Sequence, residues 1–141
     1  MSKNLTTKKL IIAVIEKDGS ILMRKKPLDS PPYKETWYLF GCEPVSNQDN
    51  PTTIKNYLKS ELGIDVEISN ESILPDLEIK QDHDGIKKNF IYINLRCKYL
   101  GGTPKIPKGA ERVRWIPKDK LSEYDIVPPS VKLFKKLGWL Q

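Results

Sequence analysis

One carboxylate in this sequence stands where helix stability alone does not explain it. Glu61 is the penultimate residue of a predicted helix that ends before Gly63. Negative charge at the C-terminal end of a helix opposes the helix macrodipole, so the position indicates a functional carboxylate as well as it indicates an ordinary surface glutamate. Two further acids lie upstream, but Glu43 is better explained as a solvated turn residue and Asp49 as a helix cap. Carboxylates are the side chains that proteins offer to Mg²⁺.

Two cations and several aromatic residues could bind other parts of an anionic ligand. Arg24 and Lys26 alternate at the end of a predicted strand, where they could meet phosphates, although an exposed strand end explains them equally well. Trp37 and Tyr38 are consecutive strand residues and therefore face opposite ways. We expect at most one of them in the core and the other facing a cleft.

The only histidine, His83, lies between two aspartates in a predicted hairpin tip. It could bind a metal or act in acid–base catalysis. Asp84 is followed by Gly85, however, and Asp-Gly pairs form turns whatever the function. An exposed turn is the favoured interpretation.

The elements that must position these residues begin with a hairpin. Apolar, β-rich runs at 8–16 and 20–24 flank an Asp-Gly pair at 18–19, and glycine tolerates the positive φ of a tight turn. A loop rich in Pro and Ser then leads to an aromatic strand at 37–40, which Gly41 is expected to close.

A helix is predicted from Pro51, with Asp49 or Asn50 as its cap. Apolar residues at four-residue intervals give it one buried stripe, and Gly63 supplies its end. The stripe consists of Ile54, Leu58 and Leu62. A strand is predicted directly afterwards, at 64–68.

The second half of the chain predicts three more strands and a closing helix. Two strands, at 77–80 and 89–99, are joined by a polar tip at 81–85, and a short strand follows at 112–116. The residues expected in the core are Phe90, Tyr92 and Leu95. The segment 128–138 begins with two prolines and ends in glycine, as an amphipathic helix does.

With this order of elements, residues 41–64 resemble the box of the Nudix family, G-x5-E-x7-R-E-U-x-E-E-x-G-U, where U is an aliphatic residue. Aligned without gaps, Cys42 takes the place of the first glycine, and Gly41 that of the glycine that commonly precedes it. The positions that build the helix match, as Leu58, Gly63 and Ile64. The positions that carry the chemistry are replaced by Gln48, Asn56, Tyr57 and Ser60, and only Glu61 is retained. The opening hairpin, the strand at 112–116 and the closing helix extend the resemblance over nearly the whole chain.

The resemblance implies an α/β fold, an α/β/α sandwich with a mixed sheet between the box helix and the closing helix. The family's box binds Mg²⁺ and a pyrophosphate, which makes Glu61 the expected metal ligand and catalytic residue. Glu111 lies before the strand at 112–116, where the family often places a loop carboxylate, and is expected either as a second catalytic acid or as a surface residue. The residues expected to bind the ligand are Arg24, Trp37, Tyr38, Gly41, Cys42 and Glu43, with Tyr33 nearby.

Positions 57, 60 and 61 share one helical face, so the family's box presents three carboxylates to one cleft and this chain presents one. A lone Glu61 could hold a Mg²⁺ ion already bridged to a diphosphate, but not the clustered metals that activate water. We therefore expect a Nudix-type protein that binds a nucleotide or another diphosphate-containing ligand with little or no hydrolysis. One alternative is an active hydrolase of nucleoside diphosphate-linked substrates that recruits Glu43 or Glu111. Another is a protein or RNA interaction module.

The composition bounds these alternatives. A length of 141 residues with 38% hydrophobic and 30% charged residues favours one globular domain over 1–141. No apolar run approaches the ~20 residues of a membrane span, no targeting signal is apparent, and Cys42 and Cys97 lie far apart, so a cytoplasmic protein is expected. The formal net charge of +6 comes from scattered Lys and Arg, which favours a solvated basic surface over nucleic-acid binding. The oligomeric state stays open, a dimer included.

Overall fold

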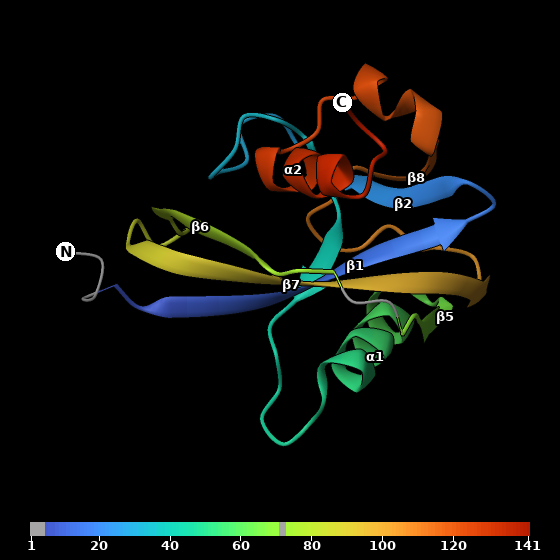
Figure 1. Ribbon diagram of the computed structural model, residues 1–141, viewed down its shortest axis with the longest axis horizontal. Coiled ribbons are helices and arrows are strands. Elements are labelled where there is room, and N and C mark those ends of the chain that lie inside the picture. Colours follow the sequence, from blue (N-terminus) through green and yellow to red (C-terminus); the bar gives the residue numbers. More distant parts are fainter. Residues whose placement is uncertain (1–4, 71–72) are drawn as a thin grey trace.

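The computed structural model describes residues 5–70 and 73–141, and its centre is a mixed β-sheet with a helix on each face (Figure 1). The strands are β1 (Thr7–Lys17), β2 (Ser20–Lys25), β3 (Trp37–Tyr38), β4 (Phe40–Cys42), β5 (Asp65–Ile68), β6 (Asp76–Gln81), β7 (Lys87–Gly101) and β8 (Arg112–Pro117). The helices are α1 (Asn50–Leu62), the 3-10 helix η2 (Lys118–Glu123) and α2 (Pro128–Lys136). The predicted α/β/α sandwich is confirmed. In the described part of the chain, no helix is long and apolar enough to cross a membrane.

The first strand, β1, joins the two halves of the sheet. It runs parallel to β7, from Thr7 opposite Asn89 to Glu16 opposite Lys98. It pairs with β2 in the antiparallel direction, but only at Glu16 and Lys17 beside the connecting turn. Earlier in β1, from Ile11 to Ala13, the partner is β4 instead. Since β3 pairs with β2, the segment that contains β3 and β4 bridges β2 and β1 where these two strands diverge.

Both predicted hairpin turns are confirmed. Asp18 and Gly19 have φ values of 48° and 79°, which match the twist that a two-residue hairpin loop must have. In the turn between β6 and β7, Gly85 has a φ of 79° and its N–H donates to the Asp82 carbonyl at 2.9 Å.

The predicted ends of α1 are also confirmed. Asp49 is the cap, and its side chain accepts a hydrogen bond from the Thr52 N–H at 2.7 Å. At the other end Gly63 takes a left-handed conformation with φ of 75° and donates to the Lys59 carbonyl at 3.0 Å. The predicted stripe of Ile54, Leu58 and Leu62 is fully buried. Burial of each such side chain stabilises the fold by roughly 1.5–3 kcal/mol.

Two hydrophobic clusters lie on opposite faces of the sheet because β1 alternates its side chains. Ile11, Ala13 and Ile15 belong to the cluster under α1, and Val14 belongs to the cluster that contains Leu133 and Phe134 of α2. Of the residues predicted for the core, Phe90 and Tyr92 are buried, and Leu95 is half-buried against the α1 cluster. The helix η2 was not predicted.

The prediction that Gly41 closes the aromatic strand was wrong. Gly41 lies inside β4 and pairs with Ile12 of β1. A Cβ atom on residue 41 would lie 2.8 Å from the Ile11 carbonyl oxygen and 2.9 Å from Ile12 Cδ1. Glycine is therefore required here by the close approach of two strands, which the one-dimensional pattern does not reveal.

Candidate functional site

A cavity of about 230 Å³ opens on the α2 face of the sheet, beside the segment that bridges β2 and β1. This volume is below the roughly 300 Å³ typical of the smallest pockets for drug-sized ligands, so the cavity fits part of such a ligand. Its aromatic wall consists of Tyr33, Tyr38, Phe90 and Tyr92. Its cations are Lys8, Arg24, Lys26 and Lys80.

Several cations around the cavity are bound to carboxylates. Lys8 and Lys88 donate to Asp82 Oδ2 at 2.9 and 2.8 Å. The bonds from Lys88 and Lys8 hold the pKa of the Asp82 carboxyl well below its usual range. At the other end of β6, Lys136 of α2 donates to the buried Asp76 carboxylate at 2.8 Å. The charges of these lysines are therefore balanced within the protein.

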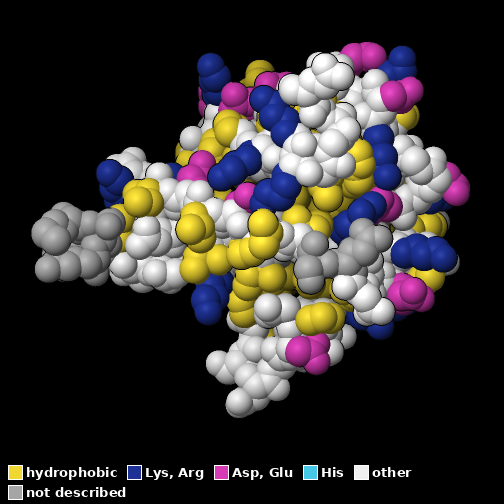
Figure 2. All heavy atoms as spheres, in the orientation of Figure 1, with side chains coloured by type: hydrophobic (Ala, Val, Ile, Leu, Met, Phe, Trp, Pro, Cys, Tyr) yellow, Lys and Arg dark blue, Asp and Glu magenta, His cyan; other side chains and the backbone are white. Residues whose placement is uncertain are grey.

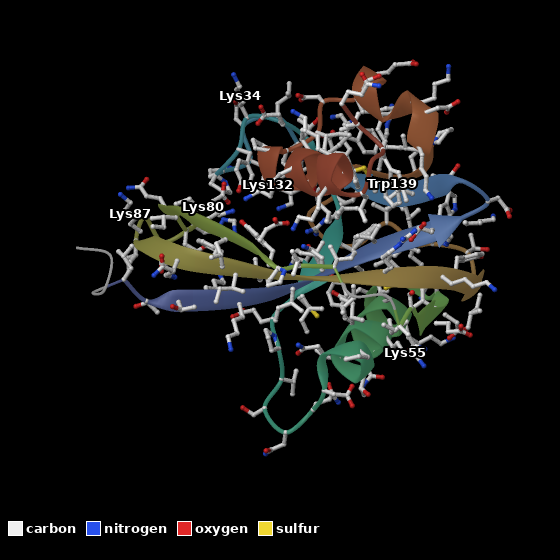
Figure 3. The ribbon with its side chains drawn as sticks, in the orientation of Figure 1. Lys34, Lys55, Lys80, Lys87, Lys132 and Trp139 are labelled. Atoms are coloured by element: carbon white, nitrogen blue, oxygen red, sulfur yellow. The ribbon has the colours of Figure 1, made fainter. Side chains whose placement is uncertain are left out.

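Glu78 organises the aromatic wall. The hydroxyls of Tyr33 and Tyr92 donate to Glu78 Oε1 at 2.6 and 2.7 Å. Burial, reinforced by the bond to Glu78, raises the pKa of Tyr33 far above its usual value, and burial also raises that of Tyr92. Lys80, which Figure 3 places on β6, donates to the Tyr33 hydroxyl at 2.6 Å and lies 3.4 Å from Glu78. Tyr33 and Tyr92 are therefore fixed by hydrogen bonds, and the charge of Glu78 is balanced by Lys80.

Arg24 differs from Lys8, Lys80, Lys88 and Lys136 because no carboxylate of the described residues balances its charge. Its buried Nε has no hydrogen-bond partner among the described residues, and the same is true of the buried Tyr38 hydroxyl. The guanidinium carbon lies 5.9 Å from the ring centroid of Tyr38 and 5.6 Å from that of Phe40. Burial lowers the pKa of Arg24, and no carboxylate is among the groups that shift it. A guanidinium nevertheless stays charged at physiological pH.

Lys26 is a second cavity cation that pairs with no carboxylate in residues 5–70 and 73–141. Its ammonium group lies 4.2 Å from the ring centroid of Tyr38. Burial first, and then the charges of Arg24 and Lys80, lower the pKa of Lys26 to about 8. Arg24 and Lys26, hereafter called the Arg24–Lys26 pair, are therefore two cations that both lie over the ring of Tyr38.

The predicted ligand-binding residues divide between the cavity and the core. Tyr38 and Gly41 line the cavity. Trp37 instead packs edge-on against Tyr124, 5.3 Å between ring centroids, in the cluster under α2. One of the two consecutive aromatic residues is thus in the core and the other faces the cavity, as the alternation of strand side chains requires.

Cys42 and Glu43 lie beside the cavity wall rather than on it. Cys42 is half-buried at the end of β4, opposite Ile11, and packs against the cluster under α1. Burial and then the charge of Glu43 raise the pKa of its thiol. Glu43 itself is exposed in the loop that follows.

The residues of the box helix do not fit the Mg²⁺ ion that the resemblance implies. Glu61 and Ser60 are exposed, and Tyr57 is half-buried. The pKa of Tyr57 is raised by burial, lowered by the charge of Arg24 and raised by that of Glu61, so this tyrosine lies within the electrostatic reach of both. The described residues contain no group of three or more His, Cys, Asp or Glu side chains that could hold a metal ion. With Glu61 as its one carboxylate, a Mg²⁺ ion would have to take its other octahedral oxygen ligands from water and from the ligand's phosphates, so the box helix offers no site that holds the ion by itself.

Neither of two other predicted candidates, Glu111 and His83, forms a hydrogen bond or ion pair with Glu61 among the described residues. Glu111 accepts a hydrogen bond from Lys25 Nζ at 2.9 Å, and its side chain is 49% exposed. His83 is in the hairpin turn with a side chain 67% exposed, at the rim of the cavity. His83 therefore lies in an exposed turn, as the adjacent Asp84-Gly85 pair predicted.

The wall formed by β6 was not predicted as part of the site. Charged side chains stand at every second position along β6 and at the residue after it, as Asp76, Glu78, Lys80 and Asp82. Such alternation marks one polar face of a strand, so the signal was present in the sequence. What the sequence does not show is that this face is turned toward Tyr33, which lies 45 residues before Glu78.

Elsewhere Lys and Arg side chains are scattered over the face seen in Figure 2 rather than gathered in one stripe.

By sequence, the chain matches no protein-family model and no curated protein. By structure, it is similar to the MutT protein from Methanosarcina mazei Go1, with a TM-score of 0.74, 14% identity and coverage of 96% of this chain and 95% of that chain. A MutT NUDIX hydrolase from Burkholderia pseudomallei gives a TM-score of 0.71 at 19% identity, covering 94% and 98%. The E. coli ORF135 protein gives 0.71 at 17% identity, covering 96% and 91%. The resemblance in residues 41–64 and the arrangement of the whole sheet agree: this chain has the fold of the Nudix hydrolases.

Proposed function

We propose that this chain is a Nudix-superfamily protein that binds a nucleotide or another diphosphate-containing ligand and hydrolyses it weakly or not at all. The observation that carries the proposal is the Arg24–Lys26 pair, which faces the cavity without a carboxylate partner in the described part of the chain. A buried charge without a counter-charge is costly, so such a site favours an anionic ligand. The planar fork of arginine matches the oxygens of a phosphate group.

The aromatic wall supports a ligand with a ring as well as a charge. Tyr38 offers a buried hydroxyl that has no partner among the described residues, and both cations lie over its ring. The cavity is too small for a whole nucleotide, so the base or sugar occupies it while the phosphates extend past the Arg24–Lys26 pair. Flat aromatic surfaces beside fixed polar groups are typical of small-molecule sites.

Weak or absent hydrolysis follows from the box helix. Metal-ion catalysis lowers the pKa of a bound water and neutralises the charge that develops during phosphoryl transfer. Glu61 is the one acid retained at the box positions, and it is exposed. Loss of metal ligands should reduce the rate by orders of magnitude, equivalent to several kcal/mol of transition-state stabilisation.

Binding is tested by thermal unfolding with a panel of nucleoside diphosphates and triphosphates, sugar nucleotides, ADP-ribose and dinucleoside polyphosphates. A ligand at one hundred times its dissociation constant adds about 2.7 kcal/mol to the free energy of unfolding, which raises Tm by several degrees. Absence of a shift with every member of the panel would contradict the proposal and favour an interaction module.

Hydrolysis is tested on the same panel with Mg²⁺ or Mn²⁺, by measuring phosphate or nucleotide release. We expect no turnover above that of the Glu61→Gln variant. Turnover that disappears in Glu61→Gln would instead establish the alternative, an active hydrolase that recruits non-standard acids.

A further inference from the structure

Because the box helix offers no site that holds Mg²⁺ by itself, the negative charge of a bound diphosphate must be neutralised by another group. A diphosphate carries several negative charges, and in a box with all its acids a divalent ion lies between the carboxylates and the phosphates. We propose that Arg24 supplies this positive charge in the present chain, so that the cavity binds its diphosphate-containing ligand without a divalent metal ion. The inference rests on the proposed function and adds to it how the phosphates are neutralised.

Arg24 can supply this charge because it contacts both the cavity and the α1 side of the sheet. It lines the cavity on the α2 face of the sheet. It also lies over the ring of Phe40, which belongs to the cluster under α1, and it acts electrostatically on Tyr57 of α1. Tyr57 occupies the position of a box glutamate. The guanidinium therefore stands between the cavity and the helix face that would otherwise hold a metal.

The unpaired state of Arg24 indicates that an exogenous anion completes it. Arg96, by comparison, donates from Nε and Nη2 to the Glu16 carboxylate at 2.7 Å each. Arg24 has two aromatic rings in place of such a carboxylate, and its Nε points at no acceptor in the described residues. Aromatic faces hold a guanidinium in place and leave its N–H groups available for a ligand.

Tyr57, which stands where the family's box has a glutamate, also supports a free positive charge on Arg24. A carboxylate within reach of Arg24 would form an ion pair with it and cancel its charge. Tyrosine does not, because burial raises the pKa of Tyr57 and keeps its hydroxyl neutral. The missing acid at position 57 and the unpaired guanidinium of Arg24 are thus parts of one arrangement. Lys26 contributes a second positive charge below its pKa of about 8.

The test is calorimetric binding of two probes, inorganic pyrophosphate and ADP, at constant ionic strength, once in EDTA and once in excess MgCl₂. We expect both probes to bind in EDTA at least as tightly as in Mg²⁺, because Mg²⁺ competes with Arg24 for the phosphate oxygens. Arg24→Gln should weaken binding by about tenfold in either buffer, as loss of a charge-assisted hydrogen bond does. Arg112→Gln is the matched control, since it removes the same charge from an exposed position of β8.

A second variant keeps Arg24 and changes its surroundings. Tyr57→Glu should weaken pyrophosphate binding in EDTA by about fivefold or more, because the new carboxylate pairs with the guanidinium. Asn56→Glu adds the same charge at the neighbouring exposed position and should have little effect. This pair of variants decides the matter even where Arg24→Gln fails to fold.

The outcomes separate the two proposals. Binding that requires Mg²⁺, or that survives both Arg24→Gln and Tyr57→Glu unchanged, overturns the role of Arg24 and leaves ligand binding standing. If neither probe binds in either buffer, the proposed function itself fails. Metal-independent binding lost in Arg24→Gln and reduced in Tyr57→Glu, with both controls unaffected, is the expected result.

Discussion

Lys26 changes its charge close to neutral pH, and ligand binding should follow this change. Burial and the charges of Arg24 and Lys80 lower its pKa to about 8, so the ammonium is charged below this pH and neutral above it. An anionic ligand favours the charged form. We therefore expect the affinity for ADP to fall as the pH rises from about 7 to about 9, measured by calorimetry at constant ionic strength.

Two variants show whether Lys26 causes this dependence. In Lys26→Met the affinity at about pH 7 should be lower and should no longer fall toward pH 9. Lys34→Met removes a lysine from the exposed loop labelled in Figure 3 and should retain the full dependence. A dependence that persists in Lys26→Met would show that another group titrates.

Among the elements, α1 depends on a single capping residue at its start. The Asp49 side chain accepts from the Thr52 N–H at 2.7 Å, and the first turn of the helix contains no acidic residue that could replace it. Asp49→Ala should lower the free energy of unfolding by about 1 kcal/mol. Urea unfolding measures this change, and Asn at the same position should cost much less because it keeps an acceptor. Equal losses in Asp49→Ala and Asp49→Asn would contradict the role of the cap.

The close approach of β4 and β1 gives a second prediction for the elements. Gly41→Ala places a Cβ against the backbone oxygen of Ile11, so β4 must move away from β1. Overpacking of this kind costs roughly 1–3 kcal/mol, and the shift should also weaken ligand binding because Gly41 lines the cavity. Gly101→Ala is the control, since a Cβ there meets nothing within 4 Å. Equal unfolding free energies for the two variants would refute the argument.

The elements also show what the sequence can and cannot predict. The turn at Asp18 and Gly19 and the ends of α1 at Asp49 and Gly63 depend on local backbone chemistry, and all were predicted. The role of Gly41 depends on its distance from another strand, and pairing between β1 and β7 joins residues about eighty positions apart. For the same reason Arg24 was recognised as a candidate for phosphate binding, while its lack of a carboxylate was not. Which cations are already paired is decided by the fold.

At the scale of the whole molecule, the fold is that of the Nudix hydrolases while most of the residues at the chemical positions of the box differ. The chain superposes on the MutT NUDIX hydrolase and the MutT protein named above with TM-scores of 0.71 and 0.74 at 19% and 14% identity. Of the box positions that match, Leu58, Gly63 and Ile64 bury a side chain or end the helix, and Glu61 is the exposed exception. The replaced positions, among them Tyr57 and Ser60, are half-buried or exposed, so their exchange costs the fold little. Stability and chemistry thus depend on different residues of one helix.

Acid should destabilise the whole molecule because ion pairs join strands that are distant in sequence. Asp82 holds Lys8 of β1 and Lys88 of β7, and these bonds lower its pKa. Burial alone would raise the pKa of Glu16, but the hydrogen bonds from Arg96 and Lys118 outweigh burial and lower this pKa.

A carboxyl whose pKa is lower in the folded than in the unfolded chain stabilises the fold above its unfolded pKa of about 4, and this contribution is lost as the pH falls further. The free energy of unfolding in urea should therefore be nearly constant from about pH 7 to about pH 5 and fall below about pH 4. Asp82→Asn should be less stable at neutral pH and less sensitive to acid, whereas Asp119→Asn, at an exposed position of η2, should resemble the unchanged protein. A stability that does not change between about pH 5 and about pH 3 would show that these ion pairs do not hold the sheet together.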